Sequence, residues 1–140
     1  MDSAAMRTLR ILLGVAVAVS VVHYTDNYFN YDDYPQPASG PAPSQAVIGA
    51  AWFFFTAFAI AGYRLYREGR MRAAALCLAV YSGSGLVGFG HYAVPGATDM
   101  PWWRQAHIVA DILCGAAVLA FAFTTVRAAG RATTAANRTA

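Results

Sequence analysis

The chain has 140 residues, of which 58% are hydrophobic and 12% are charged, and its mean hydropathy is +0.41. A water-soluble domain of this length does not carry so much apolar sequence, so the composition excludes an ordinary soluble protein and predicts an integral membrane protein. The formal net charge of +3 does not indicate nucleic-acid binding, because the arginines are spread over short segments that flank the apolar runs.

Four apolar segments are long enough for a helix to cross a hydrocarbon core, which takes roughly 20 residues. They span about 9–29, 46–66, 73–93 and 104–126. We therefore predict an all-α integral membrane protein with a single domain, residues 1–126, that forms an up-down bundle of four transmembrane helices. Residues 127–140 are mainly Ala, Thr and Arg without apolar periodicity, and we expect them to form a disordered cytoplasmic tail.

The distribution of arginine predicts the orientation of the chain. Nine of the ten positive charges flank the predicted cytoplasmic ends of the helices: Arg7, Arg10, Arg64, Arg67, Arg70, Arg72, Arg127, Arg131 and Arg138. Only Arg104 lies on the other side, so the positive-inside rule places both termini in the cytoplasm. The lysine-free composition, rich in Ala and Arg, and the short tails favour a multi-pass protein of a prokaryotic inner membrane.

The outer connections contain breakers and caps. Residues 35–43 are rich in Pro, Gly and Ser and predict an extended connector that ends at Ser44, a suitable N-cap for the second helix. Asp99 precedes the fourth helix, where we expect a cap or near-cap role. Asp32 and Asp33 are expected to be solvated surface charges.

The two halves of the chain resemble each other. A His-Tyr pair closes the first apolar segment at residue 23 and the third at residue 91, and QAVIGA at 45–50 is similar to QAHIVA at 105–110. A duplicated helical hairpin is one interpretation of these short matches, and chance similarity in an Ala-rich membrane protein is the other. A duplication would place the first and third helices diagonally, with His23 and His91 facing each other.

The glycine-rich sequence GSGLVG, residues 83–88, matches a dinucleotide-binding fingerprint, but no strand precedes it. Because it lies within a membrane helix, we interpret it as a packing surface. Ser84, Gly88 and His91 fall at i, i+4 and i+7, so they share a face along which a neighbouring helix can approach closely.

Polar residues cluster toward the outer end of three predicted helices. His107 and Asp111 are four residues apart and share one face of the fourth helix. His23, Asp26 and Asn27 share a face of the first helix in the same way. Counted at about 1.5 Å per residue from the cytoplasmic arginines, the histidines and Asp111 lie within roughly 10 Å of one another in depth. A carboxylate at that depth needs a partner inside the bundle, and His107 is the nearest candidate along the sequence.

Imidazole and carboxylate groups that converge from separate helices suit a transition metal ion such as Zn, Fe, Mn or Cu. The predicted ligands are His23, His91, His107 and Asp111. Asp111 and His107 are also the predicted catalytic residues. Around them we expect orienting contacts from Asp26, Asn27 and Ser84. The spacing matches no established metal motif.

Several functions fit this pattern. The first is a small metal-dependent membrane enzyme that acts on a lipid or small amphiphile near the outer face. The second is a haem-binding electron-transfer protein, with two of the histidines as axial ligands. The third is a non-catalytic accessory or structural subunit of a homo-oligomer or larger membrane complex, in which the polar residues only join helices. A proton-coupled exporter is less favoured, because no acidic residue lies near the membrane middle.

Overall fold

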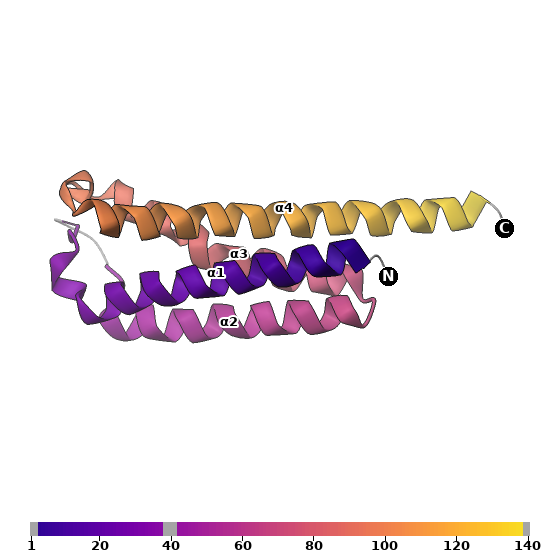
Figure 1. The fold of residues 1–140 in the computed structure, drawn as a ribbon, viewed down its shortest axis with the longest axis horizontal. Helices are drawn as coiled ribbons and strands as arrows, with labels where there is room; N and C mark the ends of the chain where they lie inside the picture. Colours follow the sequence, from indigo (N-terminus) through magenta and orange to yellow (C-terminus); the bar gives the residue numbers. More distant parts are fainter. Residues whose placement is uncertain (1–2, 38–41, 139–140) are drawn as a thin grey trace.

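The computed structural model describes residues 3–37 and 42–138, with side chains described through residue 131. The four long helices are α1 (Ser3–Phe29), α2 (Gln45–Arg67), α3 (Met71–Leu86) and α4 (Trp102–Arg138) (Figure 1). Three short 3-10 helices connect them: η1 (Tyr31–Asp33), η2 (Val87–Ala93) and η3 (Ala97–Asp99). The described part of the chain contains no strand, which confirms the all-α prediction.

Four helical segments are long and apolar enough to cross a membrane. They are Ser3–Phe29, Gln45–Arg67, Met71–Ala93 and Trp102–Arg131. The third consists of α3 and η2 together, because the last turns before the connection to α4 tighten into a 3-10 helix. Many large apolar side chains, including Phe53, Leu76 and Phe123, are exposed on the bundle surface, as expected for residues that face lipid acyl chains.

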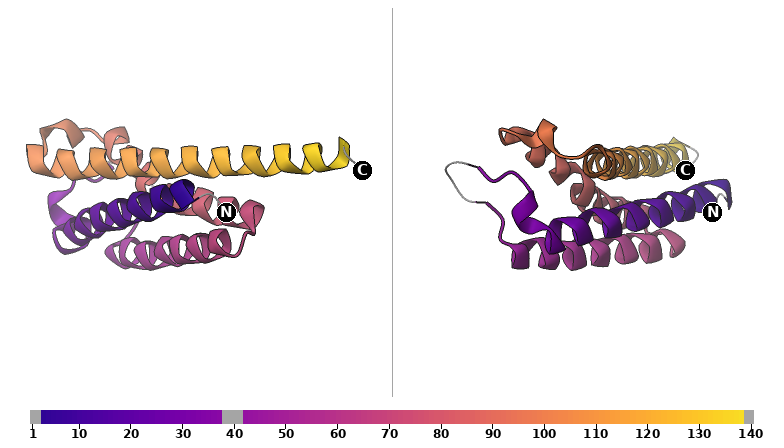
Figure 2. Two further views of the ribbon diagram at one scale, coloured as in Figure 1. Left: turned by 45° about the vertical axis from the view of Figure 1, so that its right-hand side comes forward. Right: turned by 60° about the vertical axis from the view of Figure 1, so that its left-hand side comes forward.

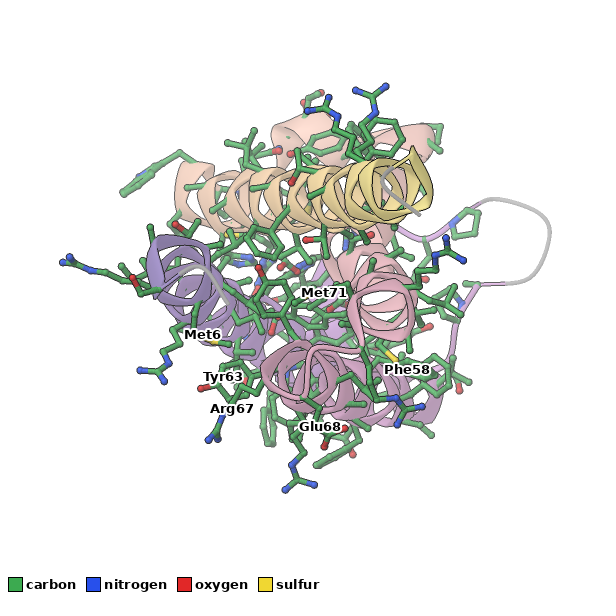
Figure 3. All side chains as sticks on the ribbon, turned by 90° about the vertical axis from the view of Figure 1, so that its right-hand side faces the viewer. Met6, Phe58, Tyr63, Arg67, Glu68 and Met71 are labelled. Atoms are coloured by element: carbon green, nitrogen blue, oxygen red, sulfur yellow. The ribbon has the colours of Figure 1, made fainter. Side chains whose placement is uncertain are left out.

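Each helix packs mainly against two neighbours. α1 contacts α2 and α4, and α3 contacts the same two helices, so α1 and α3 lie diagonally across the bundle. Figures 1 and 2 show that both chain ends lie at the same end of the bundle and that α4 extends beyond the other three helices there. Figure 3 views this end, where the Arg67 side chain points outward. The opposite end carries the two long connections and the polar cluster.

Apolar side chains fill most of the space between the helices. Leu9, Leu78 and Val118 are fully buried in the larger core, which occupies the half of the bundle near the chain ends. A smaller cluster at the other end contains Ile108 and Ile112 of α4. The polar cluster lies beside this smaller core, so its side chains are separated from the far end of the bundle by a layer of close-packed residues.

Helix ends differ from the predicted spans in two places. α1 begins at Ser3, earlier than the predicted residue 9, and α4 continues to Arg138, where a disordered tail was predicted from residue 127. Alanine has the highest helix propensity, so an Ala-rich segment extends a helix without apolar periodicity. The last two residues of the predicted tail lie outside the described residues. The predicted N-cap is confirmed, because the Ser44 side chain accepts a hydrogen bond from the Val47 N–H at 3.4 Å.

The contact between α3 and α4 depends on two glycines. A Cβ atom at Gly85 would overlap the backbone carbonyl of Asp111, and one at Gly115 would lie 2.7 Å from the carbonyl oxygen of Ser82. Gly88, on the predicted packing face, lies against Ile112. The two backbones therefore meet closely at the level of Asp111, which fixes where its side chain leaves α4.

Candidate functional site

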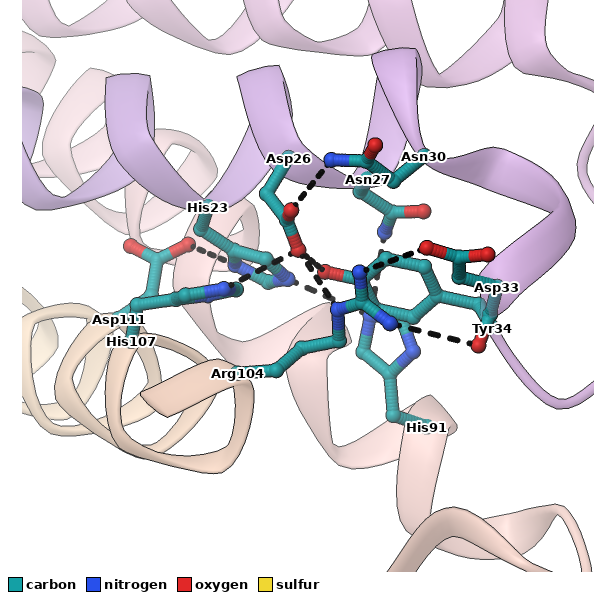
Figure 4. A network of polar contacts seen from close by, with 10 residues as sticks. All are labelled: His23, Asp26, Asn27, Asn30, Asp33, Tyr34, His91, Arg104, His107 and Asp111. Atoms are coloured by element: carbon teal, nitrogen blue, oxygen red, sulfur yellow. Dashed lines mark hydrogen bonds and ion pairs between the residues drawn. The ribbon is translucent and has the colours of Figure 1, made fainter. Parts of the chain in front are cut away.

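The polar cluster is built around a buried pair from two helices. His23 of α1 and Asp111 of α4 are each 2% exposed, and the distance from His23 Nδ1 to Asp111 Oδ2 is 2.7 Å (Figure 4). An ionised carboxylate only accepts hydrogen bonds, so a pair in which Asp111 is ionised has the proton on Nδ1 of His23. Asp111 thereby holds the orientation of this imidazole.

The other nitrogen of His23 faces a second histidine. His23 Nε2 lies 3.3 Å from Nε2 of His91, which comes from η2. The side-chain amide nitrogen of Asn27 lies 3.2 Å from the same His91 atom. His23 and His91 thus face each other across the bundle, as a duplication would place them. Asn27 contacts the His91 imidazole, and its role in orienting a metal ligand stays a prediction. A continuous polar chain thus runs from Asp111 through His23 to His91.

A second cross-helix pair lies one turn away. His107 Nε2 is 3.3 Å from Oδ2 of Asp26, which is ion-pair distance. Among the described residues, however, neither ring nitrogen of His107 has a partner in hydrogen-bonding orientation. The spacing of His107 and Asp111 on α4 predicted that these two side chains pair, but in the structure they do not. Residues one turn apart on one helix both point toward the neighbouring helix, so each meets a different residue of α1.

Arg104 is a site residue that the sequence analysis missed. Its side chain is 5% exposed, and its Nε donates to Asp26 Oδ2 at 2.9 Å while its Nη2 donates to Asp33 Oδ2 at 3.2 Å. Asp33 is therefore an ion-pair partner, although its side chain is 65% exposed, as expected for a surface charge. The sequence did contain one sign of this role, because Arg104 is the only arginine that lies away from the predicted cytoplasmic ends of the helices.

Tyr34 joins the two parts of the cluster. Its hydroxyl donates to Asp26, its ring lies 5.1 Å from the His91 ring between centroids, and the Arg104 guanidinium lies 4.7 Å from its centroid. Burial and the neighbouring Asp26 carboxylate raise the pKa of Tyr34 well above its usual value, so this hydroxyl remains a donor. Nothing in the sequence pattern had singled out Tyr34 as a site residue.

Ser84 was predicted to make an orienting contact in the cluster, but its side chain makes none. Its backbone carbonyl accepts a hydrogen bond from the Tyr24 hydroxyl at 3.1 Å. Its own hydroxyl is buried and has no hydrogen-bond partner among the described residues. Ser84 therefore helps to join α3 to α1 through its backbone and orients none of the imidazoles.

A pocket of about 510 Å³ opens beside His23 and His91. Its walls come from the last turns of α1, the first half of α2, η2 and the connector after η1, and most of them are apolar. His23, His91 and Asn27 are among its lining residues, whereas His107 and Asp111 do not line it. Asp111 therefore contacts the lining of the pocket through the His23 side chain.

The predicted four-ligand metal site is not assembled in this arrangement. Within the described ranges, no group of three or more His, Cys, Asp or Glu side chains is placed to hold a metal ion. Asp111 is engaged by His23 and His107 lies beside Asp26. Metal binding itself stays a prediction.

The geometry also bears on a haem group. With the Nε2 atoms of His23 and His91 only 3.3 Å apart, no porphyrin plane fits between them. Haem with these two axial ligands requires α1 and α3 to separate, so haem binding also stays a prediction.

Comparison of the chain with protein-family models, curated proteins and solved structures gives no match. The function must therefore be inferred from the site itself.

Proposed function

We propose that this protein is a multi-pass inner-membrane protein that binds a small amphiphile at its outer end and carries out acid–base chemistry on it. In the proposed topology the helices run up and down, both termini lie in the cytoplasm, and the polar cluster lies near the outer face. The arginines at the end where both chain termini lie support this orientation.

The observation that carries the proposal is the hydrogen-bonded chain Asp111–His23–His91. A carboxylate that holds one imidazole nitrogen leaves the other free to take or give a proton, and it stabilises the imidazolium that results. His91 then exchanges that proton with a bound molecule, because His91 lines the pocket. Asp111 keeps its predicted catalytic importance as a positioning residue for His23.

The pocket supports an amphiphile as the bound molecule. Its volume of about 510 Å³ is within the range of about 300–1,000 Å³ found for small-molecule sites. Its apolar walls with a few convergent polar groups on one side suit a molecule with a compact polar head and an apolar remainder.

Native mass spectrometry of protein released from lipid nanodiscs made with total membrane lipid tests this proposal. Wild-type protein should retain an amphiphile that His91→Phe loses and that Tyr92→Phe, a control outside the pocket lining, retains. The retained compound is then incubated with wild type and with Asp111→Asn and followed by chromatography. Conversion by wild type alone supports the proposal. Equal retention by His91→Phe, or equal conversion by Asp111→Asn, argues against it.

A metal-dependent form of the same site is favoured by one distance. Two Zn–N bonds of about 2.0–2.1 Å at a tetrahedral angle place their nitrogens roughly 3.4 Å apart, and the Nε2 atoms of His23 and His91 are 3.3 Å apart. Asp111 would then orient a liganding imidazole from behind, a common arrangement in metal sites. Elemental analysis of purified wild type beside His91→Phe tests this form, which requires stoichiometric metal in the first and none in the second.

A further inference from the structure

The described walls of the pocket contain no permanently charged side chain. None of its described lining residues is Arg, Lys, Asp or Glu. The nearest guanidinium, that of Arg104, is already engaged by Asp26 and Asp33. A phosphate or carboxylate head would therefore be desolvated without a cation to offset the cost, and an ammonium head would lack an anion. The chemistry of the walls favours a neutral head.

The polar wall can both donate and accept hydrogen bonds. With Nδ1–H of His23 held by Asp111, the neutral ring has an acceptor at Nε2, and His91 and the Asn27 amide provide donors and acceptors beside it. A single proton transfer along the chain exchanges these roles. Such a wall suits a head group whose oxygen is an acceptor in one state and a donor in another.

Aromatic and apolar groups surround this polar wall. The Tyr34 ring lies against His91, and Phe55 and Tyr24 line other parts of the pocket. Flat rings pack favourably on such side chains. Two further lining residues, Val47 of α2 and Val87 of η2, are more than half exposed on the bundle surface. In a membrane these side chains face lipid, so an apolar tail can leave the pocket between α2 and η2.

We propose that the pocket binds a neutral amphiphile with a quinone or quinol head, whose ring oxygens are held by His91 and Asn27 and whose tail extends into the outer half of the bilayer. The quinone form accepts hydrogen bonds at its carbonyl oxygens, and the quinol form donates them. This inference rests on the amphiphile pocket of the proposed function and names the class of its ligand.

Isothermal titration calorimetry on protein in lipid nanodiscs, with empty nanodiscs subtracted, tests the inference. The probe is a benzoquinone with a decyl chain, and decanol and decanoate are the same-chain comparisons. We expect saturable binding of the quinone, about tenfold or more tighter than either comparison. Loss of a hydrogen bond to the head in His91→Phe or Asn27→Ala should weaken it by about tenfold, and Tyr92→Phe should leave it unchanged.

The quinone assignment fails if decanol or decanoate binds as tightly as the quinone. It also fails if neither His91→Phe nor Asn27→Ala weakens the binding of the quinone. If the affinity for decanol or decanoate is the one that depends on His91, the quinone assignment fails and the amphiphile pocket stands. If neither variant changes the binding of any of the three probes, the pocket of the proposed function fails as well. Size-exclusion profiles that match wild type show that each variant is folded.

Discussion

His23 and Asp111 are 88 positions apart in the sequence, yet they form a buried hydrogen bond of 2.7 Å between α1 and α4. The pair is completed at the level where α3 and α4 approach most closely, since the carbonyl of Asp111 lies against Gly85. One helix crossing thus sets the position of the carboxylate, and the carboxylate sets the orientation of the imidazole that faces the pocket.

Removal of the carboxylate should destabilise the bundle. Asp111→Ala leaves the Nδ1 donor of His23 buried without its partner, which costs about 1–3 kcal/mol in the free energy of unfolding. Unfolding in mixed micelles with increasing denaturing detergent measures this change. In the double variant that combines Asp111→Ala with His23→Ala, the loss of unfolding free energy should be smaller than the sum of the losses in the two single variants. Additive losses would show that the two side chains do not interact.

The Arg104 network should hold the connector after η1 in place. Arg104→Gln leaves the largely buried Asp26 carboxylate without its cation, and breaking such a pair costs about 3–5 kcal/mol. Hydrogen exchange should then become faster in residues 31–37. Arg70→Gln is the matched control, because the Arg70–Glu68 pair is exposed and 3.9 Å apart and is expected to contribute under about 1 kcal/mol. Equal effects of the two changes would contradict the role of Arg104.

A methyl group at the α3–α4 crossing should disrupt the site. Gly85→Ala places a Cβ against the Asp111 carbonyl, so the helices must separate and the His23–Asp111 contact must lengthen. We expect a clear loss of thermal stability in detergent. Gly14→Ala is the control, since a Cβ there meets nothing within 4 Å, and alanine favours a helix by about 1 kcal/mol over glycine. Gly85→Ala with wild-type stability would contradict the close crossing.

The proposed topology makes opposite predictions for two connections. In a background with Cys77→Ala and Cys114→Ala, a membrane-impermeant thiol reagent added to intact cells should label Asp99→Cys. The same reagent should label Glu68→Cys only after the cells are broken, because residue 68 lies in the predicted cytoplasmic loop. The reverse labelling pattern would place the polar cluster on the cytoplasmic side.

The sequence was sufficient to predict the four spans because the length of an apolar run is set by the thickness of the bilayer. It also placed His23 and His91 at similar depth, since helical rise converts residue number into distance. It could not predict which acidic residue pairs with which histidine. That choice depends on the rotation of α1 and α4 about their own axes. The position of α4 against α3 is set by the contacts at Gly85 and Gly115, and these contacts cannot be derived from the spacing of residues in the sequence.

Arg104 could not be placed from the sequence for a related reason. A lone arginine beside Trp102 and Trp103 is typical of a membrane interface. Its burial depends on the chain after α1 folding back, so that Asp33 and Tyr34 reach it. Only the path of the connector brings these residues together.

The protonation of the three histidines provides the most direct test of the Asp111–His23–His91 chain. Nuclear magnetic resonance of protein labelled with ¹⁵N at the imidazole nitrogens resolves the tautomer of each ring, and His23→Ala assigns the His23 signals. We expect Nδ1 of His23 to carry a proton that is strongly deshielded and protected from exchange with water, and to lose that protection in Asp111→Asn. A His23 ring that has no proton on Nδ1, or that exchanges freely in wild type, would contradict the Asp111–His23–His91 relay.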